Sequence, residues 1–277
     1  MNDYPPKIKL QSKFPKDIPH AYIKGYVEFY KLKFKVTPDV LIPRPETELL
    51  VDEVLRFLSQ LHTTNYELPT LVLLDLGTGA GNIAISIAKN LILHPKGVKV
   101  NIIATDVSAK ALKVARQNAK LHGVEDKITF LQSDLLSNVI PANAGIQLIK
   151  SRSELDPRLR GDDNLIIVTN LPYIPSARIP YLDSSVKDFE PLVALDGGED
   201  GFELYRKLFQ QLKEKNWLAR RSLGEGRKLK IFVGEIDYTH GELAGNVAQK
   251  YFPKAKVEVK TDLAHKQRIL IIKHSTG

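Results

Sequence analysis

The residues best suited to chemistry are Asn170, Leu171, Pro172 and Tyr173, which directly follow the apolar segment 165–169. The nitrogen of an amide or an aromatic amine is a poor nucleophile, because its lone pair is delocalised. The Asn170 side-chain carbonyl and the Leu171 backbone carbonyl can accept hydrogen bonds from such an NH₂ group and orient it for attack. Pro172 keeps Leu171 out of the helical region, and Tyr173 can stack on a planar substrate or wall the pocket. On their own, these four residues are better explained by an ordinary Asn-x-Pro turn; only together with the glycine-rich feature upstream do they predict a site.

A second chemical feature is a glycine-rich turn, Gly77-Thr78-Gly79-Ala80-Gly81, at the end of another apolar segment. Three acids accompany it: Asp75 precedes the turn, Asp106 ends the next expected strand, and Asp134 follows the third. A glycine turn lets a ligand approach the backbone closely, and an acid at the second strand end suits a ribose diol. The spacing is neither that of a dinucleotide fingerprint nor that of a phosphate loop. The pattern predicts a cofactor with ribose, adenine and no phosphate, namely S-adenosylmethionine.

Alternating strands and helices are expected to position these residues. Such an alternation is typical of an α/β, doubly wound, mostly parallel sheet, here with seven strands and an antiparallel edge at the C-terminus. A β-hairpin over 24–30 and 33–37 and a helix over 46–61 precede the sheet. The expected strands are 71–76, 100–106, 127–132, 165–169, 229–235, 257–260 and 268–273, and the expected helices are 82–93, 109–122, 201–215 and 241–251.

The domain prediction divides the chain at residue 45. Residues 1–45 are expected to be an extended arm (1–20) and the hairpin, and 46–277 the cofactor-binding domain. Residues 138–163 and 216–228 lack periodicity and interrupt the alternation, so they are predicted to be surface insertions. A docking loop for a partner is the functional alternative for both.

Three further segments resemble a known family. Class I methyltransferases that act on planar nitrogen share motifs of the Asn-Pro-Pro-Tyr type. Residues 22–30 (Tyr-Ile-Lys-Gly-Tyr-Val-Glu-Phe-Tyr), 41–48 (Leu-Ile-Pro-Arg-Pro-Glu-Thr-Glu) and 189–201 (Phe-Glu-Pro-Leu-Val-Ala-Leu-Asp-Gly-Gly-Glu-Asp-Gly) narrow the match to the HemK/PrmC family of release-factor glutamine methyltransferases. The resemblance covers roughly residues 20 to 273.

The resemblance implies transfer of a methyl group from S-adenosylmethionine to the side-chain amide nitrogen of a glutamine, in the Gly-Gly-Gln loop of peptide chain release factors. It places the glutamine amide on Asn170, Leu171, Pro172 and Tyr173, and the adenine on Leu135. The residues predicted to bind the cofactor are Gly77, Thr78, Gly79, Ala80, Gly81, Asp106, Asp134, Leu135 and Asn170.

The chain departs from the family at Leu171, where a proline is usual, and in the two insertions. Only about 20 residues precede the match, too few for the family's helical N-terminal recognition domain. Because Asn-Leu-Pro-Tyr also resembles ribosomal RNA adenine dimethyltransferases, N6-adenine methylation of RNA or DNA is the alternative activity. An inactive cofactor-binding remnant is the alternative outside the enzymes.

Charge and composition narrow the remaining classes. The net charge of +8 is concentrated in residues 1–45 and 213–230, which is not the continuous basic stripe of a nucleic-acid groove. The sequence has no cysteine, and its seven histidines show no ligand spacing, so no metal is expected. It has neither a signal peptide nor an apolar run of membrane-spanning length, which predicts a soluble, cytoplasmic protein with no membrane partner.

Overall fold

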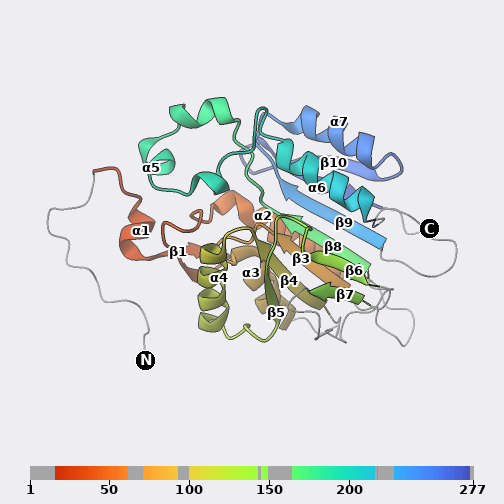
Figure 1. Ribbon diagram of the computed structural model, residues 1–277, viewed down its shortest axis with the longest axis horizontal. Coiled ribbons are helices and arrows are strands. Elements are labelled where there is room, and N and C mark those ends of the chain that lie inside the picture. Colours follow the sequence, from red (N-terminus) through yellow and green to blue (C-terminus); the bar gives the residue numbers. More distant parts are fainter. Residues whose placement is uncertain are drawn as a thin grey trace.

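The computed structural model describes residues 16–61, 71–92, 100–142, 145–148, 164–215, 217 and 228–274. Within these ranges a seven-stranded sheet has the strand order β10-β11-β9-β8-β3-β4-β5 (Figure 1). The predicted fold class is confirmed, including the antiparallel C-terminal edge. The parallel strands are β3 (Leu71–Leu76), β4 (Val100–Asp106), β5 (Ile128–Gln132), β8 (Asn164–Thr169) and β9 (Lys228–Glu235), and the antiparallel edge is β11 (Gln267–Lys273) with β10 (Lys256–Thr261).

Two hydrophobic cores sandwich this sheet, because successive strand residues point to opposite faces. Leu71 and Leu73 pack with helices α2 (Glu48–Gln60), α3 (Asn82–Ile92) and α4 (Ala109–Leu121). Val72 and Leu74 pack with α6 (Glu203–Glu214) and α7 (Gly241–Tyr251). Figure 1 shows these two groups of helices on opposite sides of the sheet. Buried on both faces, the central strands read as continuous apolar runs in the sequence.

The expected N-terminal hairpin is also present, as β1 (Tyr26–Phe29) and β2 (Leu32–Lys35). Asn118 of α4 fixes it against the sheet: its side-chain oxygen accepts from the Lys35 N–H at 2.8 Å, and its NH₂ group donates to the Lys35 and Ala80 carbonyls at 3.0 and 2.8 Å. Of the expected extended arm over 1–20, residues 1–15 lie outside the described residues. A short helix that was not expected, α1 (His20–Lys24), follows the arm.

The two predicted insertions are only partly described, and the described parts are not all surface. A two-stranded hairpin, β6 (Val139–Ala142) and β7 (Gly145–Leu148), forms where no regular structure was expected. Val139 is fully buried, and Trp217 is 2% exposed in the core beside α6. The rest of 138–163 and 216–228 lies outside the described residues, so the division into a domain with insertions stays a prediction.

The chain between β8 and α6 consists of short turns of helix that the sequence pattern did not predict, because segments of three to six residues are too short for a periodic signal. They are η2 (Ser176–Tyr181), α5 (Ser184–Lys187) and η3 (Leu192–Ala194), and a similar turn, η1 (Pro45–Thr47), precedes α2. In the part of the chain that the structure describes, no helix has the length and apolarity needed to cross a membrane.

Candidate active site

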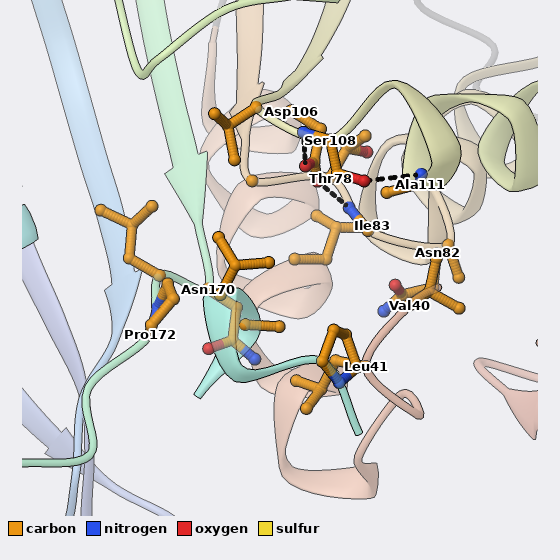
Figure 2. A pocket seen from close by; sticks show the side chains of 18 of the residues that line it. Val40, Leu41, Thr78, Asn82, Ile83, Asp106, Ser108, Ala111, Asn170 and Pro172 are labelled. Carbon is orange, nitrogen blue, oxygen red and sulfur yellow. Dashed lines mark hydrogen bonds between the residues drawn. The ribbon is translucent and has the colours of Figure 1, made fainter. Parts of the chain in front are cut away.

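The order of the parallel strands creates a crevice at one edge of the sheet. The chain runs from β3 outward through β4 to β5, and then returns to place β8 on the other side of β3. Ligands of doubly wound sheets bind at such a reversal, outside the carboxyl ends of the strands. A cavity of about 260 Å³ lies there, lined by the turn after β3, the ends of β4 and β8, and the segment before α2. In Figure 2, Asp106 and Ser108 lie on one side of it, with Asn170 and Pro172 on another.

The structure brings most of the sequence-predicted site residues into this one cavity. Gly81 and Tyr173 are the two that do not line it; both lie next in sequence to residues that do. The predicted residues in the cavity wall are Gly77, Thr78, Gly79, Ala80, Asp106, Asp134, Leu135, Asn170, Leu171 and Pro172.

The glycine turn has the backbone conformation that its composition predicts. The backbone φ angles of Gly77, Gly79 and Gly81 are +72°, +53° and +82°, a conformation that residues other than glycine rarely adopt. A Cβ atom at Gly79 would meet nothing within 4 Å, so this part of the turn faces open space. The buried Asp75 carboxylate stabilises the turn: it accepts hydrogen bonds from the Thr78 hydroxyl at 2.6 Å and from the Ala84 N–H at 3.2 Å. Burial raises the pKa of Asp75 to about 7.

Asp106 combines a structural task with exposure to the cavity. One carboxylate oxygen accepts from the Gly79 N–H at 2.8 Å, and the other accepts from the Ser108 N–H at 2.8 Å. Burial raises the pKa of this carboxyl, and the two N–H donors oppose that rise. The Val107 N–H also acts on this carboxylate. A carboxylate has about four acceptor positions, so acceptor capacity remains for a hydroxyl group of a ligand. Asp106 therefore holds the glycine turn and offers acceptors at the same time.

Asn170 sits level with Gly77, because Thr169 and Leu76 are register partners and the Thr169 hydroxyl donates to the Leu76 carbonyl at 2.6 Å. Its side-chain NH₂ group donates to the Thr47 hydroxyl oxygen at 3.1 Å. The side-chain oxygen is the acceptor that remains for a ligand. Since β3 lies between β8 and β4, Asn170 and Asp106 stand about 10 Å apart across the turn, two strand spacings.

One wall of the cavity comes from the segment before α2, for which the sequence analysis found a family resemblance and no chemical role. Arg44 makes an ion pair with Glu190, and the Ile42 N–H donates to the same carboxylate at 3.4 Å. The contact joins two of the segments that carried the resemblance across 146 positions of sequence. Periodicity and spacing could not reveal it. In the segment before α2 and around η3, the wall residues that only the structure identified are Asp39, Val40, Leu41, Pro43, Arg44, Thr47, Pro191, Val193 and Ala194.

The glycines after η3 allow their loop to pack closely against the backbone that follows Asn-Leu-Pro-Tyr. The Gly197 N–H donates to the Ile174 carbonyl at 2.9 Å, and the Ser176 N–H donates to the Gly198 carbonyl at 2.9 Å. A Cβ atom at Gly201 would lie 2.3 Å from the Tyr173 carbonyl oxygen. Only a residue without a side chain allows this close approach. The glycine loop therefore packs directly against the backbone after β8 and holds it in place.

Known proteins resemble this chain over nearly its whole length. A family model described as "Methyltransferase domain" matches residues 68–156. A release factor glutamine methyltransferase of Bacillus cereus is 35% identical over 91% of this chain and 75% of its own length. One from Clostridium acetobutylicum is 36% identical over 92% of this chain and 75% of its own. The chain belongs to the release factor glutamine methyltransferase family. It is thus a methyltransferase.

Solved structures agree on the fold. The catalytic domain of human Mettl16 in complex with MAT2A 3'UTR hairpin 1 matches with a TM-score of 0.57, covering 89% of this chain and 76% of that one at 14% identity. The N-terminal domain of the same human protein in complex with SAH matches with a TM-score of 0.51 at 14% identity, covering 89% and 77%. At this identity the likeness establishes a shared methyltransferase fold and nothing about the substrate.

The cavity of this methyltransferase fits S-adenosylmethionine, its methyl donor. Asp39, Asp106 and Asp134 line it, and among its described lining residues Arg44 is the one cation, already paired with Glu190. An acidic cavity suits the donor's sulfonium and amino groups and offers no free cation for a phosphate. Leu135, 7% exposed, adds an apolar wall for the adenine, and its φ of +53° turns the chain there. Asp134 is half-exposed and also pairs with Lys207 at 2.5 Å.

Proposed function

We propose that this chain transfers a methyl group from S-adenosylmethionine to the side-chain amide nitrogen, N5, of a glutamine in a peptide chain release factor, in the Gly-Gly-Gln loop. The names of its relatives support a release factor as substrate. The observation that carries the proposal is the orientation of Asn170, whose NH₂ group is held by Thr47 so that its oxygen can accept from a substrate amide. We place this activity in the cytoplasm, where release factors work. We assign it to residues 46–277 together with the cavity-lining residues between Asp39 and Arg44, with the rest of residues 1–45 as a recognition region.

The residues at the end of β8 do the positioning. The Asn170 oxygen and the Leu171 carbonyl accept the two N–H bonds of the glutamine amide, so that the nitrogen lone pair is aimed across the cavity. Pro172 keeps the Leu171 backbone extended, which presents its carbonyl. Both acceptors gain strength as the nitrogen loses its resonance with the carbonyl and becomes more positive. The rate gain comes from this positioning and from electrostatic stabilisation.

When bound, S-adenosylmethionine supplies an electrophilic methyl group on a sulfonium, so one carbon–sulfur bond is exchanged for one carbon–nitrogen bond. The methylated nitrogen then carries one proton too many, and it is far more acidic than an ordinary ammonium, so water can take that proton. No general base is needed. The buried carboxylate of Glu235 agrees with this, since both its oxygens accept from protein hydroxyls and it does not line the cavity.

The proposal is tested by incubating the protein with methyl-labelled donor and, in parallel, purified release factor, release factor with the loop glutamine changed to alanine, and total RNA. Label should appear on the parent release factor alone, at the glutamine on mass-spectrometric mapping. Label on adenine in RNA would establish the alternative activity, and label on none of the three would point to an inactive remnant.

A further inference from the structure

Behind Asn170 lies a buried hydrogen-bond network that continues from Thr47 to Glu235 and Tyr173. The Thr47 hydroxyl donates to Glu235 Oε2 at 2.6 Å, and the Tyr173 hydroxyl donates to Glu235 Oε1 at 3.0 Å. Thr47 in turn accepts from the Asn170 NH₂ group. Thr47 is 2% exposed and Glu235 is fully buried. We call Thr47, Tyr173 and Glu235 the Glu235 network.

While Glu235 is ionised, counting the available hydrogens determines which group donates in each hydrogen bond of this network. A threonine hydroxyl has one hydrogen, and here it is committed to the Glu235 carboxylate. The Thr47 oxygen can then only accept, so Asn170 must turn its NH₂ group toward Thr47 and its oxygen away. An asparagine amide that is free to flip would spend part of its time presenting NH₂ to the substrate NH₂, two donors facing each other.

The three members come from segments far apart in the sequence. Thr47 ends η1, Tyr173 follows β8, and Glu235 is the last residue of β9. Thr47 belongs to one of the segments that resembled the family, yet no chemical pattern in the sequence gave it a role. Bringing these residues together behind the Asn170 amide costs free energy, because it buries the carboxylate of Glu235.

We infer that Thr47 and Glu235 are positioning residues that fix the flip state of the Asn170 amide and thereby select an NH₂-bearing substrate. The inference deepens the proposed function and rests on it. Tyr173 completes the network by holding the second Glu235 oxygen, which gives this residue of the motif a role behind the cavity.

The orientation of the Asn170 amide should depend on pH, because it depends on the charge state of Glu235. Burial, above all, and the nearby Glu46 raise the pKa of Glu235, while Thr47, Tyr173 and Arg268 lower it; together these effects leave the pKa at about 7. The Tyr205 hydroxyl donates to the backbone carbonyl of Glu235 and not to its carboxylate. A proton on Oε2 would donate to Thr47, send the Thr47 hydrogen to Asn170 and flip the amide. Methyl transfer should therefore fall as the pH drops through about 7.

The test compares Thr47→Val with Thr47→Ser in the full chain. Valine keeps the shape and loses the hydroxyl, whereas serine keeps the hydroxyl and loses a methyl group. We expect Thr47→Val to lower kcat by on the order of 10–100-fold, with KM and donor affinity changed much less. Thr47→Ser should recover most of that loss. The fall in kcat below about pH 7 should be seen in the parent and in Thr47→Ser and be absent in Thr47→Val. A purely packing role predicts the opposite ranking, with valine better than serine, and that ranking would overturn the inference.

A second readout does not depend on activity. The side-chain ¹⁵N and ¹H shifts of Asn170, assigned by the loss of its signals in Asn170→Asp, report the hydrogen bond from its NH₂ group to Thr47. They should move in Thr47→Val and stay close to the parent in Thr47→Ser; equal shifts in all three proteins would refute the inference. If the parent methylates no release factor while the shifts behave as expected, the proposed function fails and the network stands.

Discussion

Replacing Asp106 tests the cofactor site, and the structure changes what a simple loss of contact would predict. Asp106→Ala removes an acceptor for the ribose hydroxyls. A lost hydrogen bond to a charged group is worth about 1–3 kcal/mol, which corresponds to roughly 5–150-fold weaker binding of S-adenosylmethionine. The same change removes the acceptor of the Gly79 and Ser108 N–H groups. The Gly79 N–H belongs to the glycine turn itself. The free energy of unfolding should therefore also fall by about 1–2 kcal/mol in the absence of S-adenosylmethionine.

Both quantities are measurable on the same samples. Calorimetry gives the dissociation constant, and urea unfolding with and without donor gives the two free energies. Asp126→Asn is a matched control, because Asp126 is exposed, pairs with Lys127 at 2.7 Å and does not line the cavity. It should change neither quantity by more than about 0.5 kcal/mol. A folded Asp106→Ala protein with the parent's affinity would refute the ribose assignment.

Three other changes probe the elements around the site. Leu171→Pro restores the usual family residue and keeps the carbonyl, but it removes a backbone hydrogen bond to Tyr205; methyl transfer should persist, and urea unfolding should show a loss of about 1–2 kcal/mol. Complete loss of transfer would mean that more than the carbonyl is needed. Gly201→Ala places a Cβ against the Tyr173 carbonyl at a φ of +76°. We expect it to lower the free energy of unfolding by at least about 1–2 kcal/mol and to slow methyl transfer. A parent-like rate and stability would show that the glycine loop does not hold the backbone after β8. Deletion of residues 149–163 with a Gly-Ser bridge should leave the circular dichroism spectrum and donor affinity intact, and insoluble or unfolded protein would show that this segment packs into the domain.

The sheet and its individual strands could be predicted because the signal of each strand is local. Each parallel strand contains a short apolar run, and β3, β4 and β8 are followed or closed by Gly77, Asp106 and Asn170. Strands β3 and β4 begin and end where the pattern placed them. The predicted site residues meet for the same reason: residues at the carboxyl ends of neighbouring parallel strands share one edge.

What could not be predicted depends on contacts between distant segments. The pairing of Arg44 with Glu190 and the convergence of Thr47 and Tyr173 on Glu235 span between 62 and 188 positions. None of them leaves a periodic trace. Trp217 was misplaced for a related reason: it is a single core residue in a stretch without periodicity, and its carbonyl accepts from the Leu229 N–H at 3.3 Å.

The central claim is that Asn170 holds a glutamine amide in line with the methyl donor. Single-turnover methyl transfer to a release factor, with saturating donor, tests it most directly. Asn170→Ala should transfer more slowly by on the order of 10²–10³, the scale of one lost preorganised polar contact, while calorimetry shows a much smaller change in donor affinity. An Asn170→Ala protein that transfers as fast as the parent would contradict the amide-holding mechanism and remove the main physical support for glutamine as the substrate.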